Sequence, residues 1–169
     1  MERPAGSDGA PRQEAAGAKL ERVLRVLLLV VGLAPFVAPF ARRVTSPATG
    51  ELVYALFAPV CHTRPERTLL VASVLMPLCS RCAGIFAGFV TASVLPAPRL
   101  RVRACLGYGF LASVIMLIDV ITQDLGLRPL WHPARLATGV VWGHVFALGI
   151  LAIGREHLGK PRRRVTSSA

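Results

Sequence analysis

The sequence lacks the short motifs that identify several large enzyme classes. It contains no phosphate-binding loop, no nucleophile elbow and no His-Glu-x-x-His zinc motif. Acidic residues are also scarce, with 9 Asp and Glu against 20 Lys and Arg, and the formal net charge is +11. In a soluble protein this imbalance would suggest nucleic-acid binding. Because the basic residues here flank long apolar runs, we interpret them as a topology signal that also attracts anionic lipid head groups, and we expect no nucleic-acid partner.

Apolar residues make up 53% of the chain, and the mean hydropathy is +0.54. These residues come in long runs, which is typical of a membrane protein. Four segments reach or approach the roughly 20 residues that cross a bilayer core: residues 20–41, 78–95, 103–123 and 134–154. We therefore predict a single-domain, all-α polytopic protein with about four transmembrane helices, embedded in the lipid bilayer.

The two ends of the chain are expected to lie outside the membrane domain, which we place at residues 20–156. Residues 1–19 carry too little apolar surface to fold and are predicted to be a disordered tail, and residues 157–169 form a basic tail. The basic flank of the first apolar segment is also compatible with a signal peptide. The long upstream tail favours a retained anchor, and we expect Pro35 and Pro39 to bend its far end.

The apolar stretch 68–95 is too long for one span and carries Arg81 near its middle. A single continuous helix would place this charge at mid-bilayer, at a cost of about 3 kcal/mol. Pro77 suits the first turn of a helix, so we predict that the second span is residues 78–95. Residues 68–76 then form an interfacial or re-entrant piece, and the first loop hugs the membrane.

The distribution of Lys and Arg predicts the orientation of the chain. The two tails and the loop between the second and third spans carry thirteen basic residues, against seven on the opposite side. We predict a multi-pass protein of the plasma (bacterial inner) membrane with both termini in the cytoplasm and the first and third loops outside.

This topology brings four polar segments to the same membrane face. They hold Cys61, His62, Arg64 and Arg67 in the first loop, Cys79, Arg81 and Cys82 at the start of the second span, Asp119 and Gln123 at the end of the third, and Arg135 and Thr138 at the start of the fourth. Each alone could be an ordinary interfacial residue. Taken together we interpret them as one shared site, since ionisable groups in a membrane are functional candidates.

Asp119 lies just inside the apolar run 111–121. An unpaired carboxylate there is costly, so it needs a cation or a proton. The candidate cations are Arg67, Arg81 and Arg135, which are also our candidates for binding an anion. A salt bridge that only locks the helices together is an equally good interpretation.

The pair Cys79-x-x-Cys82 is the most specific chemical signal. At i,i+3 on a helix start the two sulfurs point the same way, and the helix dipole lowers the thiol pKa. Together with Cys61 and His62 the set is Cys3His, which is common at tetrahedral zinc sites, so zinc or iron is the expected cofactor. Two alternatives stay open: a redox dithiol with Cys61 as the resolving thiol, and a structural disulfide. If the site is catalytic, Cys79, Cys82 and Asp119 are the candidates.

Two small-residue motifs predict close helix packing. They are Gly84-x-x-x-Gly88 in the second span and Gly139-x-x-x-Gly143 in the fourth. His144 also lies in the fourth span, about half a turn away from Arg135 on the helical wheel. We therefore expect His144 to be a packing residue that points away from the polar face.

The polar clusters follow one another in a recognisable order. They read Cys61-His62, Pro65-Glu66-Arg67-Thr68, Pro77-Leu78-Cys79-Ser80-Arg81-Cys82-Ala83-Gly84-Ile85, Asp119 with Thr122-Gln123, and Arg135-Leu136-Ala137-Thr138-Gly139. This order and spacing resembles the uncharacterised prokaryotic membrane proteins grouped as domain of unknown function 2085. The resemblance implies no reaction, but it supports treating the clusters as one site.

The chain departs from this family pattern at three positions. Thr63 stands where family members usually have Gln, Val120 where they often have Gly, and Phe86 where they favour Tyr. We therefore predict an integral membrane protein with a Cys/His/Arg/Asp site at one face, which binds metal or carries out thiol redox chemistry. The alternative is a small transporter, or a protein that binds anions or anionic lipids, with structural cysteines.

Overall fold

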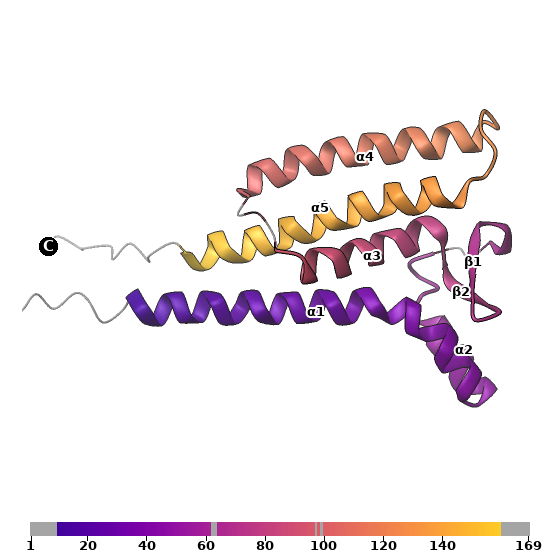
Figure 1. Cartoon of the computed structure of the whole chain (residues 1–169), viewed down its shortest axis with the longest axis horizontal. Helices are drawn as coiled ribbons and strands as arrows, with labels where there is room; N and C mark the ends of the chain where they lie inside the picture. The colour runs from indigo at the N-terminus through magenta and orange to yellow at the C-terminus, as the bar shows by residue number, and fades with distance from the viewer. Residues whose placement is uncertain (1–9, 62–63, 97, 99, 160–169) are drawn as a thin grey trace, which may run out of the picture.

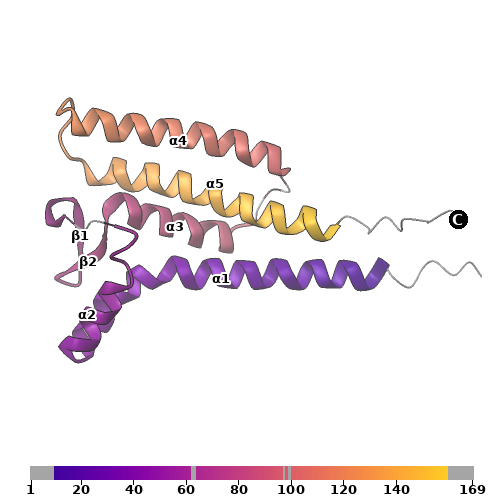
Figure 2. The ribbon, with the colours of Figure 1, turned by 180° about the vertical axis from the view of Figure 1, so that it is seen from behind.

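The computed structural model describes residues 10–61, 64–96, 98 and 100–159, which form a bundle of long helices with one small hairpin (Figures 1 and 2). In chain order the elements are α1 (Ala10–Val44), α2 (Pro47–Ala55), the 3-10 turn η1 (Pro65–Arg67), β1 (Thr68–Val71), β2 (Val74–Cys79), α3 (Ser80–Val94), α4 (Val102–Asp124) and α5 (His132–Gly159). The polytopic, mainly helical architecture expected from the sequence is confirmed.

Among the described residues, three helical stretches are long and apolar enough to cross a membrane: Gly17–Val44, Val102–Asp124 and His132–Glu156. They correspond to the first, third and fourth predicted spans. The predicted second span is the shorter α3, whose 15 residues rise only about 22 Å. This is less than the roughly 30 Å of a bilayer core. α3 packs between α1 and α5, so neighbouring helices cover part of its surface.

The ends of the chain differ from the sequence-based expectation. α1 already begins at Ala10, so residues 10–19 are helical where we predicted a disordered tail. The Ala, Gln, Glu and Lys residues of this segment favour helix, which explains the difference. The helix also continues past Pro35 and Pro39 to Val44, and both prolines are fully buried. α5 likewise runs to Gly159, into the predicted basic tail of residues 157–169, while residues 1–9 and 160–169 lie outside the described residues.

β1 and β2 form an antiparallel hairpin in the region that we predicted to be an interfacial or re-entrant piece. Its turn residues Ala72 and Ser73 both have positive φ, as a tight two-residue hairpin turn requires. Ala and Ser do not predict such a turn, because its two central residues are usually Asn-Gly or Asp-Gly. Our placement of Pro77 in the first helical turn is wrong: Pro77 lies in β2, and α3 begins at Ser80. A two-stranded sheet has only edge strands, where proline is tolerated.

α3 and α5 contact each other through the glycines of the two predicted motifs. A Cβ atom on Gly84 would collide with the backbone of Leu136 and Gly139. A Cβ atom on Gly88 would meet the backbone of α5 around Gly143 at 2.8 Å or less. The predicted close approach is confirmed, and the order of the contacts shows that α3 and α5 run parallel. Both helices therefore begin at the same end of the bundle.

Replacing Gly84 with alanine is expected to destabilise the protein by about 1–3 kcal/mol, because the new methyl group meets backbone atoms that cannot move aside. Thermal unfolding of the detergent-solubilised protein measures this loss. Gly107→Ala in α4 is the matched control, since a Cβ atom there meets nothing within 4 Å. Equal melting temperatures for the two variants would show that the α3–α5 contact is not tight.

His144 follows this glycine contact on α5. Its Nδ1 atom lies 2.9 Å from the Thr91 hydroxyl of α3, which makes it a hydrogen-bonded packing residue between the two helices. At the far end of the bundle, Glu21 of α1 pairs with Arg155 of α5 at 2.8 Å. The start of α1 and the end of α5 thus lie together, opposite the hairpin (Figures 1 and 2).

Candidate functional site

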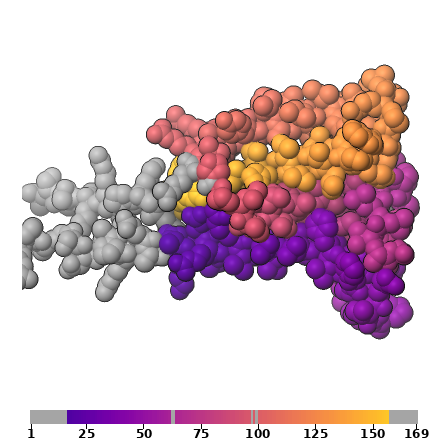
Figure 3. Space-filling model, in the orientation of Figure 1, coloured from indigo at the N-terminus to yellow at the C-terminus, as the bar shows by residue number. Residues whose placement is uncertain are grey.

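The predicted site residues gather at the end of the bundle where α3 and α5 begin and α4 ends. The hairpin lies beside this end, and α2 projects from it (Figures 1 and 3). Cys79 is the last residue of β2 and the N-cap of α3, so β2 continues directly into α3 at this cysteine. The hairpin thereby joins the Cys61 loop to the start of α3.

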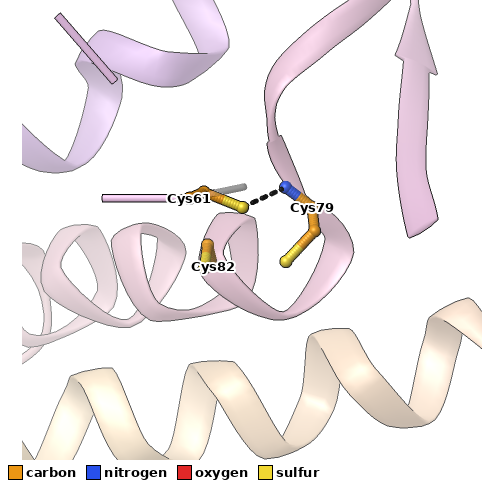
Figure 4. Close-up of side chains that lie close together, drawn as sticks. All are labelled: Cys61, Cys79 and Cys82. Carbon is orange, nitrogen blue, oxygen red and sulfur yellow. Dashed lines mark hydrogen bonds between the residues drawn. The ribbon is translucent and has the colours of Figure 1, made fainter. Parts of the chain in front are cut away.

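Three of the four predicted metal ligands are brought together. The sulfur atoms of Cys61, Cys79 and Cys82 all lie within 4.8 Å of one another. The Cys79 backbone N–H donates a hydrogen bond to the Cys61 sulfur at 3.4 Å, and the three side chains point toward one another (Figure 4). Among the described residues, no disulfide joins these three cysteines. The fourth predicted ligand, His62, lies outside the described residues.

The three thiols differ in their electrostatic environment. A hydrogen bond from the Cys82 thiol, together with backbone N–H groups at the start of α3, lowers the pKa of Cys79 to about 4. Burial raises the pKa of Cys61, against the smaller opposing effect of the Cys79 N–H. Cys79 is therefore the thiol that carries negative charge at neutral pH.

Asp119 lies near the C-terminal end of α4 and is 6% exposed. Its Oδ2 atom accepts a hydrogen bond from Arg81 at 2.5 Å, and the same Arg81 nitrogen lies 3.4 Å from Gln123 Oε1. Its Oδ1 atom pairs with Arg128. Of the three partners that we considered for Asp119, only Arg81 makes an ion pair with it. Arg67 instead pairs with Asp124 at 3.4 Å.

Arg128 is a site residue that the sequence reasoning missed. It reaches Asp119 because the chain reverses at the end of α4. Gly126 has a φ of +70°, and the N–H groups of Gly126 and Leu127 bond back to the carbonyls of Gln123 and Thr122. This pattern is the Schellman motif of helix ends. A glycine two residues after Asp124 was the available signal for it.

Arg135 is the most deeply buried of the site arginines, with 2% of its surface exposed. Its Nε and Nη1 atoms are buried and have no hydrogen-bond partner among the described residues. The Thr138 hydroxyl donates a hydrogen bond to the Arg135 carbonyl of its own helix at 3.1 Å. Arg64 is exposed at the start of η1, where its carbonyl accepts the Arg67 N–H.

Comparison with known proteins places this cluster inside the region that a protein-family model matches. The family model described as "Predicted membrane protein (DUF2085)" matches residues 61–149, more than half of the chain. An uncharacterised protein of Methanocaldococcus jannaschii is 25% identical over 148 residues, which cover 82% of this chain and 94% of that protein. An uncharacterised protein of Methanothermobacter thermautotrophicus is 32% identical over 111 residues, 63% of this chain and 96% of that protein. No solved structure matches the chain.

Proposed function

This chain belongs to the DUF2085 family of predicted membrane proteins, and on that premise we propose that its three clustered cysteines bind a thiophilic metal ion, with zinc as the best fit. One observation carries the proposal: sulfur atoms from two separate segments converge within 4.8 Å of one another. Thiolates are the preferred ligands of zinc in structural and catalytic sites, and iron is the other metal that such a set holds.

The spacing of the sulfur atoms supports this reading. Ligand sulfurs around one tetrahedral zinc ion lie about 3.8 Å apart, given a Zn–S bond of about 2.3 Å. The observed limit of 4.8 Å needs only a small inward movement of the side chains. The hydrogen bond that the Cys79 backbone N–H donates to the Cys61 sulfur stabilises negative charge on that sulfur, as a metal thiolate requires. His62, next to Cys61 in the sequence, is the predicted fourth ligand.

Metal analysis of the protein purified in a neutral detergent tests the proposal. We expect about one zinc ion per chain in the wild type and almost none in Cys79→Ser, since a site that loses one of three thiolates binds far more weakly. The matched control is Cys105→Ser: Cys105 is buried near the start of α4, away from the cluster, so its metal content should equal that of the wild type. Absence of zinc and iron from wild-type protein purified without chelators would contradict a metal site.

A second function, thiol–disulfide exchange, is favoured by the hydrogen bond between the thiols of Cys82 and Cys79. In it the Cys79 thiolate attacks a substrate disulfide and releases one substrate thiolate. Cys82 then loses its proton and displaces the second substrate thiol, which leaves a Cys79–Cys82 disulfide and a reduced substrate. A metal-free protein in which Cys79 and Cys82 form a disulfide reversibly would support this function in place of metal binding.

The orientation of the chain belongs to the same proposal. Both described ends of the chain lie at one end of the bundle, the end with Arg22, Arg25, Arg101 and Arg155. The excess of basic residues on that side supports a cytoplasmic location for it. The cysteine site then lies at the outer face of the plasma membrane, where redox exchange of thiols is permitted.

A further inference from the structure

Positive charge exceeds negative charge at the site end of the bundle. Arg81 and Arg128 share the single carboxylate of Asp119, and Arg67 pairs with Asp124. Arg135 has no ion pair among the described residues. Four guanidinium groups thus meet two carboxylates and the Cys79 thiolate, which leaves an excess of positive charge beside an apolar bundle. Such an excess is unfavourable unless a bound anion balances it.

The buried polar atoms without a hydrogen-bond partner indicate which kind of ligand this end of the bundle would bind. Among the described residues they include the Ser80 hydroxyl, Arg81 Nε, Gln123 Nε2, and Nε and Nη1 of Arg135. All of these atoms can donate a hydrogen bond, and four of the five can only donate. A buried donor without an acceptor costs about 1–3 kcal/mol. A group of such donors is therefore matched by a ligand that brings several acceptor oxygens.

The helices that hold these donors add to the positive potential. Ser80 and Arg81 are the first two residues of α3, and Arg135 lies in the first turn of α5. Because α3 and α5 run parallel and touch at Gly84 and Gly139, their N-termini lie side by side. The N-terminus of a helix carries about half a positive charge and free N–H groups that favour anions.

We propose that the adjoining ends of α3, α4 and α5 bind a phosphate group, supplied either by inorganic phosphate or by the head group of an anionic phospholipid. A phosphate monoester carries a charge of about −1.5 to −2, and the phosphodiester of an anionic phospholipid head group carries a single negative charge, so either offsets the excess of positive charge. Its oxygens accept several hydrogen bonds at once, and arginine is suited to bind two of them with its planar fork. The inference stands apart from the metal site, since none of the proposed hydrogen-bond donors is a cysteine side chain.

Equilibrium binding to the purified full chain in neutral detergent, at constant ionic strength set with chloride, tests this site. The two probes are sodium phosphate and the short-chain lipid dihexanoyl-phosphatidylglycerol. We expect Arg135→Gln to weaken binding by about tenfold or more, because a charged hydrogen-bond donor is lost. Ser80→Ala, a smaller change, should weaken binding by about threefold or more. The control is Arg101→Gln, an exposed arginine at the opposite end of α4, which should bind as the wild type does.

The two probes separate the two sources of phosphate. Binding of sodium phosphate that Arg135→Gln abolishes supports a site for a free anion, and binding of the lipid alone supports a head-group site. If neither probe binds to wild-type protein, the proposal is wrong. It is equally wrong if Ser80→Ala and Arg135→Gln both bind as the wild type does. Should Arg135→Gln fail to fold, the comparison of Ser80→Ala with Arg101→Gln decides alone. Cys79→Ser should keep the binding, so that failure of the metal site and failure of this site can be told apart.

Discussion

Asp119→Ala is expected to destabilise the protein by about 3–5 kcal/mol, because it leaves the guanidinium of Arg81 buried without its counter-charge. Arg81 is only 8% exposed and lies 2.5 Å from Asp119. Arg128 would lose its partner as well, but its side chain is 47% exposed and can turn to water. Thermal or denaturant unfolding in detergent measures the loss, and a variant that fails to accumulate in the membrane marks its upper range.

Two further variants show whether burial is the cause. Asp124→Ala removes the carboxylate of a more exposed pair five residues further along α4, so its effect should be about 1 kcal/mol or less. The double variant Arg81→Leu/Asp119→Leu removes both buried charges and should recover part of the stability lost in Asp119→Ala. If Asp119→Ala and Asp124→Ala were equally stable, Asp119 would not be the counter-charge that holds this end of the bundle together.

Alkylation of Cys79 in the metal-free protein is expected to depend little on pH between pH 6 and 8.5. The lowered pKa of about 4 means that Cys79 is already a thiolate throughout this range, and its rate falls only when the pH approaches 4. An ordinary thiol with a pKa of about 8.5 would react about 150-fold faster at pH 8.5 than at pH 6. For Cys79 we expect a change of about twofold or less, measured with iodoacetamide and peptide mapping by mass spectrometry.

Cys82→Ala provides the control for this pH profile. It removes the thiol that donates the hydrogen bond to Cys79, which is the largest cause of the lowered pKa. The pKa of Cys79 should then rise, and the rate should increase with pH over part of the same range. A wild-type rate that rises about tenfold per pH unit from pH 6 would contradict a thiolate at Cys79. Bound zinc should slow the reaction at every pH, which links this measurement to the metal analysis.

Much of the architecture was predictable because it depends on local properties of the chain. Apolar runs near 20 residues long predicted the helices that became α1, α4 and α5, since length and hydropathy decide whether a helix fits a bilayer. The two glycine motifs predicted close helix packing, and the structure shows that they meet each other between α3 and α5. The family resemblance, drawn from the order of the polar motifs, is also confirmed by the family match.

The hairpin was less accessible to sequence reasoning. A short apolar stretch has the same composition in a strand, a re-entrant helix or an interfacial segment, so its periodicity does not separate them. The turn at Ala72 and Ser73 lacks the Asn-Gly signal that marks most tight hairpins. As a consequence we placed the start of the second span too early, at residue 78, whereas α3 begins at Ser80.

By itself, the sequence determined that this is a helical membrane protein and which polar residues an apolar environment makes expensive, because both follow from composition and spacing along the chain. Only the tertiary structure decided how those residues pair. It joined Asp119 to Arg81 and Arg128, turned Arg67 to Asp124, and left Arg135 buried without an ion pair among the described residues. Pairing depends on how each helix is rotated and where α4 reverses at Gly126, and such long-range geometry is decided by packing between segments far apart in the sequence.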